Sequence, residues 1–285
     1  METSDFPRIS VAFRANDEAS AKVRADFPLV LSVSMINESA IQASSQNAPF
    51  EDQIRELEGR LEAGRITEQE FRDAVEGIKR GMIKVRTYRL GGPEGWPRFI
   101  RFQALTEDAW SELDWPLWLL LYYPREQVVD LDGSTSCYVE FGLDPEDPKR
   151  PAGEFQTRAV VEISRDVVVE SNVVEIGLLE EATPKAERGK EEYLLARGRY
   201  AYKRGLYDEA MGYAKGTLKA NPGSIPSLQL QAEIEKARGN LPEALAAYEK
   251  ALKAFTEQKP DIREPPRVFI SEINRLRATL KEKQT

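Results

Sequence analysis

Within the first 180 residues of the chain, several segments alternate between apolar and polar positions with a period of two. This alternation is typical of β-strands that bury one face, and it begins in segments 8–14 and 28–36. The apolar positions that fall on one face of these two segments are Ile9, Val11, Phe13, Leu29, Leu31, Val33 and Met35. We therefore expect the front of the chain to form strands around a hydrophobic core.

Further β-rich runs follow, separated by clusters of Gly, Pro and Asp. They lie at 82–90, 98–105, 118–123, 136–141, 154–163 and 167–178, and Ser164, Arg165 and Asp166 make a predicted hairpin turn between the last two. Strands of this spacing without alternating helices predict an antiparallel β-sandwich. The last two segments resemble the closing strands of bacterial immunoglobulin-like or fibronectin-like domains, so residues 1–181 are expected to form such a domain.

The segment from about 50 to 81 breaks the strand pattern with two helical stripes. Ile54, Leu57 and Leu61 share one helical face before Gly64, which is expected to end the first helix. The spacing of Thr67 and Glu70 predicts a capping box at the start of the second helix. Its stripe is formed by Phe71, Val75 and Ile78, and Gly81 ends it. The run 57–71 resembles the short helical hairpin called a SHOCT domain.

Four tryptophans crowd into a short stretch, and the strand around them is apolar on both faces. Alternation places Trp115, Leu117, Leu119 and Leu121 on one face and Trp118, Leu120 and Tyr122 on the other. A strand of this kind is central in a sheet or covered on its second face. The sequence favours the helical hairpin as the cover, and a partner protein is the alternative.

The remainder of the chain repeats itself after 34 residues. Arg204 aligns with Arg238, Gly205 with Gly239, Ala210 with Ala244, and Gly198 with Ala232. A helical period of 34 with small residues in register resembles the tetratricopeptide (TPR) repeat, a helix–turn–helix unit that stacks into an α-solenoid. After a linker at 182–189, two units are expected at about 191–224 and 225–258.

A last amphipathic segment, at about 266–283, is expected to cap the second unit within the tail of residues 190–285. The TPR resemblance implies a concave groove lined by the first helix of each unit, and hence a partner-binding set. That set is Leu195, Arg199, Tyr202, Lys203, Gln229, Glu233 and Lys236. It does not match the Lys and Asn residues with which some members bind a terminal carboxylate. The alternative is that these residues are only a solvated polar face.

The absence of histidine limits the chemistry that the chain can perform. It excludes Ser-His-Asp and Cys-His catalysis and His-ligated zinc. The single cysteine, Cys137, excludes an internal disulfide and is expected in the core. No spacing of Asp or Glu singles out a catalytic pair, so we expect no enzyme activity, no metal and no cofactor.

Charge is divided unevenly, with 20 Lys and Arg against 14 Asp and Glu from Pro184 onward, in a chain of net charge −8. This weakly basic tail does not indicate nucleic-acid binding. No apolar run reaches the length of a membrane-spanning helix, and the start lacks a signal-peptide pattern. We expect a cytoplasmic protein without membrane insertion.

These observations together predict an α+β protein of two domains, a β-sandwich with a helical insertion and a short TPR tail. The predicted function is a non-enzymatic adaptor or scaffold, a subunit of a hetero-complex that holds a protein or peptide segment of acidic or mixed charge. The alternative is a regulatory subunit or chaperone of a separately encoded enzyme.

Overall fold

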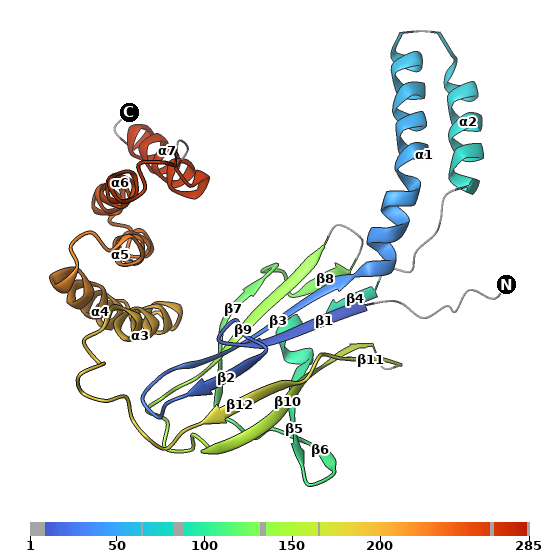
Figure 1. Ribbon diagram of the computed structural model, residues 1–285. Helices are drawn as coiled ribbons and strands as arrows, with labels where there is room; N and C mark the ends of the chain where they lie inside the picture. The colour runs from blue at the N-terminus through green and yellow to red at the C-terminus, as the bar shows by residue number, and fades with distance from the viewer. Residues whose placement is uncertain are drawn as a thin grey trace.

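The computed structural model describes residues 9–63, 65–81, 88–131, 135–164, 166–262 and 265–283. The chain is a mixed α+β protein with three parts (Figure 1): the sheet region (9–37 and 88–178), the hairpin (α1 and α2) and the helical tail (α3 to α7). This agrees with the expected fold class at the level of α+β.

One sheet of the sheet region has four strands in the order β1-β3-β9-β7, all antiparallel. Its strands are β1 (Ile9–Ala15), β3 (Leu29–Asn37), β9 (Ser136–Leu143) and β7 (Leu117–Tyr123). The predicted inward positions of β1 and β3 are confirmed, because every second residue from Ile9 and from Leu29 is buried.

The second sheet has six strands in the order β2-β12-β10-β5-β6, with β11 beside β10. Its strands are β2 (Ser20–Val23), β5 (Ile100–Thr106), β6 (Ala109–Glu112), β10 (Gly153–Ser164), β11 (Val167–Glu170) and β12 (Val174–Leu178). One prediction was wrong here, because the single strand expected at 167–178 is two strands, both paired with β10. The sequence analysis did not identify β2, which pairs with β12 in parallel.

Two strand predictions fall partly outside these elements. Of the strand expected at 82–90, only β4 (Tyr88–Gly91) lies in the described residues, where it pairs with β8 (Val128–Leu131). A 3₁₀ helix, η1 (Trp96–Phe99), occupies the start of the strand expected at 98–105. The turn between β10 and β11 is confirmed by the pairing of Ser164 with Val167, although Arg165 lies outside the described residues.

The two sheets share one hydrophobic core. Its largest fully buried side chains include Trp96, Phe13 and Met35, and Cys137 is fully buried as expected. Burial raises the pKa of the Cys137 thiol to about 12, so this cysteine is an inert core residue rather than a nucleophile.

Strand β7 does not follow simple alternation. A register shift between Leu119 and Leu121 in its pairing with β9 reverses the faces after Leu119. Tyr122 therefore packs against the core with Leu117, whereas Trp118 remains 51% exposed. The predicted grouping of Tyr122 with Trp118 was wrong because the sequence gives no sign of the bulge.

The hairpin is longer than predicted. Helix α1 (Glu38–Glu62) begins directly after β3, twelve residues before the expected start, and α2 (Glu68–Gly81) follows. The capping box is confirmed: the Thr67 N–H donates to Glu70 Oε2 at 2.8 Å, and the Glu70 N–H donates to Thr67 Oγ1 at 3.3 Å. The predicted end at Gly64 lies outside the described residues.

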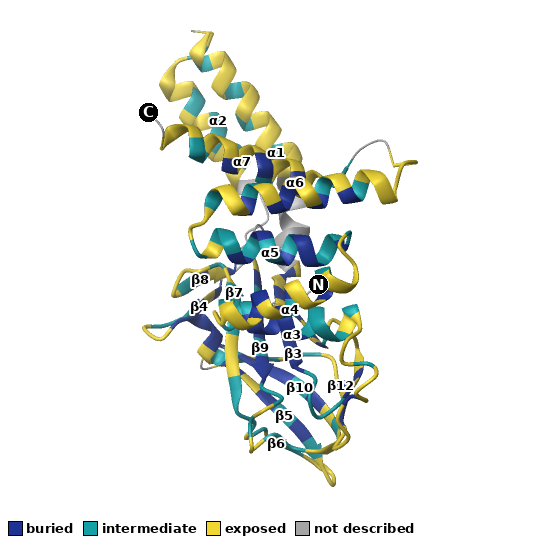
Figure 2. Cartoon of the chain, turned by 90° about the vertical axis from the view of Figure 1, so that its left-hand side faces the viewer, coloured by how far each residue is buried: buried dark blue, intermediate teal, exposed yellow. Residues whose placement is uncertain are grey.

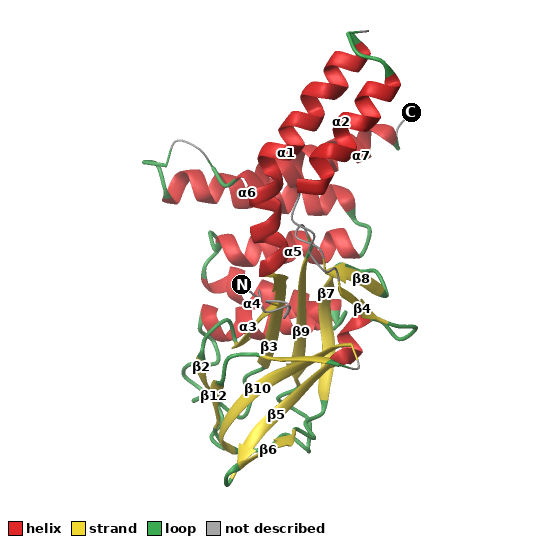
Figure 3. Cartoon of the chain, turned by 90° about the vertical axis from the view of Figure 1, so that its right-hand side faces the viewer, coloured by secondary structure: helices red, strands yellow, loops and turns green. Residues whose placement is uncertain are grey.

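The hairpin does not cover the tryptophan-rich strand, contrary to prediction. Figures 1 and 3 show it standing away from the sheets, and its main contact with them is at the base of α1, beside β1. No side chain that the structure describes between 48 and 79 is buried. The cover of the four-stranded sheet comes instead from the tail.

The tail consists of two helix pairs and a last helix. The helices are α3 (Glu191–Lys203), α4 (Tyr207–Ala220), α5 (Ile225–Ala237), α6 (Leu241–Gln258) and α7 (Arg267–Glu282). Gly205 and Gly239 both adopt positive φ, 76° and 82°, in the turns at which the pairs reverse. A Cβ on Gly198 would lie 2.9 Å from a methyl group of Leu230 and 3.1 Å from the Cβ of Tyr213, so the glycine allows α3 to pack closely on its neighbours. The two pairs thus reverse through turns of the same backbone conformation.

The last helix closes the hydrophobic core of the tail. Phe269, Ile273 and Leu276 of α7 are buried in one cluster with Ala244 and Tyr248 of α6. Figure 2 shows the buried faces along the tail and the exposed surface of the hairpin.

Candidate partner-binding surface

Helix α3 lies between the sheet region and the remainder of the tail. Its Tyr200 ring packs over Gly142 of β9, where an added Cβ would lie 2.5 Å from the ring and 2.7 Å from Leu120. The absence of a Cβ at this position lets the helix approach the sheet this closely. The outer face of the four-stranded sheet is therefore covered in part by α3.

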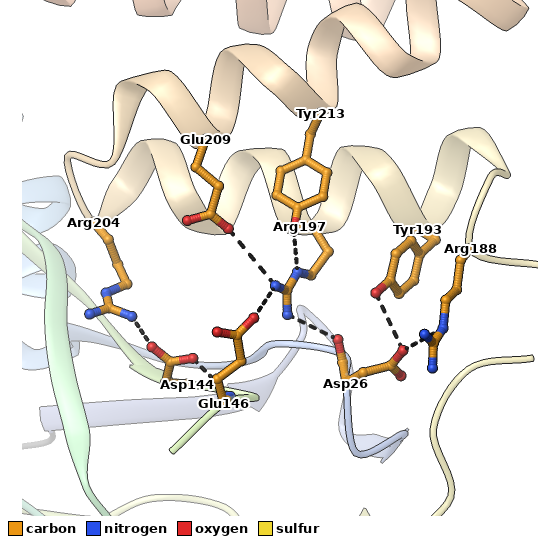
Figure 4. A network of polar contacts seen from close by, with 9 residues as sticks. All are labelled: Asp26, Asp144, Glu146, Arg188, Tyr193, Arg197, Arg204, Glu209 and Tyr213. Atoms are coloured by element: carbon orange, nitrogen blue, oxygen red, sulfur yellow. Dashed lines mark hydrogen bonds and ion pairs between the residues drawn. The ribbon is translucent and has the colours of Figure 1, made fainter. Parts of the chain in front are cut away.

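Arg197 joins the tail to the sheet region from the centre of α3 (Figure 4). It is only 8% exposed. Its guanidinium donates to Glu146 Oε1 at 2.7 Å, to the Asp26 carbonyl at 3.2 Å and to Tyr213 Oη at 3.0 Å. Burial lowers the pKa of Arg197, but the hydrogen bonds to Glu146 and Tyr213 outweigh it and raise the pKa. The Arg197 side chain is therefore charged, and it is held by Glu146 and Asp26 of the sheet region and by Tyr213 of the tail.

Asp26 forms a second polar junction (Figure 4). Its carboxylate accepts hydrogen bonds from the Thr183 N–H at 2.7 Å and from Tyr193 Oη at 3.3 Å, and pairs with Arg188 at 3.2 Å. Burial raises the pKa of Asp26. The hydrogen bonds from Thr183 and the charge of Arg188 lower the pKa by more than burial raises it, so the net shift is downward. This carboxylate ties the start of the tail to the loop before β3.

The end of α3 makes two more ion pairs with the sheet. Arg204 pairs with Asp144 and lies 4.8 Å above the ring of Trp118, which is the cation–π geometry. Lys203 Nζ lies 2.5 Å from Glu140 Oε2, and Glu140 is itself buried on the outer face of β9. These contacts, with Arg197, fix the direction in which the tail leaves the sheets.

An open cleft of about 700 Å³ remains beside α3, between this helix and the segment from β1 to β3. Three of the predicted groove residues, Leu195, Arg199 and Lys203, line it. Arg199 is exposed, and it has no ion pair among the described residues. The cleft therefore presents Arg199 beside the neutralised Lys203, together with three carboxylates that have no ion pair among the described residues, Asp17, Glu18 and Glu192.

The other predicted groove residues are placed differently. Tyr202 packs against the cluster around Ala210, with its ring 5.9 Å from that of Tyr207. On α5, Gln229 donates to Glu233 at 3.0 Å, and Lys236 lies 2.9 Å from Glu272 of α7. Of the seven residues, three thus line the cleft, Tyr202 packs in the cluster around Ala210, and the three on α5 lie on the polar surface that runs toward α7.

Sequence reasoning missed the residues that join the tail to the sheets. They come from three separate parts of the chain, Asp26, the pair Asp144 and Glu146, and Arg197, and each is an ordinary charged residue in its local pattern. The one available signal is Arg197 itself, a charge on a helix whose neighbours Gly198 and Ala201 are buried. A charge at such a position needs a partner from another element.

The comparisons with known proteins do not supply a family. No family model matches the chain, and no curated protein matches it. Among solved structures, a chain of AggA, the major subunit of aggregative adherence fimbriae type I from Escherichia coli, is matched at a TM-score of 0.26 and 7% identity. The match covers 63% of this chain and 99% of the fimbrial subunit. A likeness this weak carries no argument about fold or function.

The described residues offer little for other chemistry. They contain no group of three or more His, Cys, Asp or Glu arranged to hold a metal ion. None of the described helices combines the length and the apolar character that crossing a membrane requires. The structure does offer a helical tail that is attached to the sheet region through α3 and has one polar, partly open side.

Proposed function

We propose that the protein is a non-enzymatic adaptor that binds a segment of a partner protein on the side of the tail formed by α3, α5 and α7. In this proposal the tail is a short TPR-like solenoid, and the sheet region is an immunoglobulin-like β-sandwich to which the solenoid is fixed. The partner segment carries acidic or mixed charge.

The observation that carries the proposal is the structural equivalence of the two helix pairs. The 34-residue period places Gly205 and Gly239 in turns of the same conformation, and it places Ala210 and Ala244 at fully buried positions. Equivalent pairs stacked side by side leave their first helices along one surface, which is the surface that solenoid proteins use for binding. In Figure 1, α3, α5 and α7 lie on the side of the tail nearer the sheets.

The charges on this side set the chemistry of the partner. Arg199 is the free cation at the cleft, whereas Lys203 is engaged by Glu140 and Lys236 by Glu272. Arginine residues that become desolvated on binding usually carry much of an interface's energy. An acidic side chain of the partner is the natural counterpart of Arg199, and its mixed neighbours suit a segment that also carries basic residues.

The rigid connection between tail and sheets supports a binding role as well. Arg197, Arg204 and Asp26 hold α3 in one orientation, so that little ordering of the protein is needed when a partner binds. A preorganised surface binds more tightly than a mobile one of the same composition.

The test compares two arginine variants against a partner purified with the protein from its native source. Arg199→Ala should weaken that partner by about 2 kcal/mol or more while leaving thermal unfolding unchanged. Arg125→Ala, an exposed arginine beside the tryptophan-rich strand, is the matched control and should bind as the parent does.

Calorimetry gives both affinities. Unchanged binding by Arg199→Ala together with weakened binding by Arg125→Ala would move the site to strand β7. Tyr202 is a poorer choice for substitution, because its packing against the Ala210 cluster links affinity to stability.

A further inference from the structure

The open cleft beside α3 has unpaired charges of both signs on its two walls. One wall is the turn from β1 to β2, which carries Asp17 and Glu18, and the other is α3, which carries Arg199 and Glu192. All four side chains are exposed, and none has an ion pair among the described residues. The cleft therefore offers charges that a bound molecule can neutralise.

The remaining charged residues that line the cleft each have a partner of opposite charge. The pairs are Lys203 with Glu140, Arg24 and Lys190 with Glu187, and Lys22 with Glu154. The charges left over are thus two carboxylates on the turn, and one guanidinium and one carboxylate on the helix.

The acidic wall has a fixed position. Asn16 and Asp17 both have positive φ, 48° and 67°, as the central residues of a tight hairpin turn do. The Asn16 side-chain oxygen accepts a hydrogen bond from the Val30 N–H at 2.8 Å, and the Asn16 N–H donates to the Val30 carbonyl at 2.8 Å. These bonds tie the turn to β3, so that Asp17 and Glu18 are held at the side of the cleft.

The helix wall is fixed as well, because Arg197 and Arg204 anchor α3 to the sheet region. Arg199 lines the same cleft as Asp17 and Glu18, but it forms no ion pair with either of them. Opposite charges that face one cleft and stay apart leave room for a chain that brings the complementary charges between them. Half-buried Leu195 and Val30 add apolar surface to the lining.

We propose that the cleft binds an extended segment of the partner protein in which an acidic residue stands directly beside a basic one. This inference rests on the proposed function and specifies the segment that the tail binds. Successive side chains of an extended chain point to opposite sides. The acid therefore meets Arg199 on the helix wall, the base meets Asp17 and Glu18 on the turn wall, and a second base meets Glu192. In a helix, by contrast, side chains on opposite sides are two residues apart.

The first test uses the full chain and the partner purified with it from the native source. The double variant Asp17→Asn, Glu18→Gln removes both charges of the turn wall and keeps its shape, because Asn tolerates the positive φ of this turn. Calorimetry should show binding weakened about three- to tenfold, as expected for two exposed ion pairs. Glu107→Gln with Glu112→Gln removes the same charge from exposed positions of the sheet region and should bind as the parent does.

Arg199→Ala separates this inference from the adaptor proposal. Weaker binding by Arg199→Ala, with the turn variant equal to its control or tighter than the parent, would overturn the inference and leave the adaptor proposal standing. Unchanged binding by both would overturn both. Weaker binding by the turn variant alone would show a purely basic segment, which contradicts the pairing of an acid with Arg199.

The spacing of the two charges is tested with a synthetic peptide of the partner segment that hydrogen exchange shows to be protected in the complex. Each charged residue of the peptide is neutralised in turn and measured against Arg199→Ala and against the turn variant. We expect the acid to couple with Arg199 and the adjacent base with the turn, each by about threefold or more. Coupling of an acid and a base two residues apart, or no coupling, would overturn the extended segment.

Discussion

The tail and the hairpin are both built from amphipathic helices, but they differ in how far they bury their apolar faces. In the tail, Ala244, Ala251 and Ile234 are fully buried, and α7 closes the end. In the hairpin, no described side chain from 48 to 79 is buried. The difference follows from small residues in register: Gly198 and Ala232 let neighbouring helices approach closely, and the hairpin has only two helices to pack. Apolar stripes on the helices of a repeat thus predict a buried core, whereas apolar stripes on the helices of an isolated hairpin predict side chains that stay partly exposed.

The largest expected effect is the loss of unfolding free energy when a buried aromatic side chain is removed from the tail, compared with the same substitution in the hairpin. Phe269→Ala removes the buried anchor of α7 and should lower the free energy of unfolding by about 3–5 kcal/mol. The same change in the hairpin, Phe71→Ala, removes a half-exposed ring and should cost well under half as much. Chemical denaturation of both variants gives the two values. Equal losses would show that the hairpin is as well packed as the tail.

The next prediction concerns how the helices are attached. Arg197→Met removes three hydrogen bonds of a buried guanidinium and should cost at least about 1.5–3 kcal/mol, the value expected for one hydrogen bond to a charged group. Arg55→Met, in the hairpin, breaks the exposed pair with Asp52 and should cost about 0–1 kcal/mol. Thermal melting of the two variants is the measurement. A larger loss for Arg55→Met would reverse the assignment of which part is anchored.

A third substitution tests the close packing within the repeat. Ala244→Leu places three extra carbons at a fully buried position of α6 and should destabilise the protein by about 1–3 kcal/mol. Ala74→Leu adds the same atoms to the partly open face of α2 and should be nearly neutral. If the two variants melt alike, the position of Ala244 is not a helix crossing.

The smallest effect depends on pH and separates a buried polar contact from a solvated one. The pKa of Asp26 is lowered in the folded state from its ordinary value of 3.8. Its contribution to stability is therefore present above that value and is lost as the pH falls through the lower folded pKa. Asp26→Asn should be less stable than the parent at pH 7, and the difference should shrink steadily below pH 3.8. A constant difference would show that the charge of Asp26 is not what stabilises the junction.

Much of the secondary structure could be predicted from the sequence. The alternating positions from Ile9 and from Leu29, the capping box at Thr67 and the turns at Gly205 and Gly239 follow from local patterns, and each lies where it was expected. The start of α1 and the division of 167–178 into two strands were missed. In both cases continuity or pairing with the element just before it in the chain decides the outcome, and the local apolar pattern does not show this.

The candidate surface could be predicted only in part. Sequence periodicity identifies which residues of α3 and α5 share a helical face, but it does not show what those faces meet. Lys203 is neutralised by Glu140 and Tyr202 joins a packed cluster because the sheets and the second helix of the pair lie beside α3. The ion pairs of Arg197 with Glu146 and of Asp26 with Arg188 connect residues more than 50 positions apart and leave no local trace.

Hydrogen exchange of the full chain, with and without its native partner, tests the proposed adaptor role most directly. We predict that the partner protects the amides of α3 and α5 around Arg199 and Lys236, while those of α4 and α6 exchange as before. Protection confined to α4 and α6, or to strand β7, would contradict the proposed binding surface.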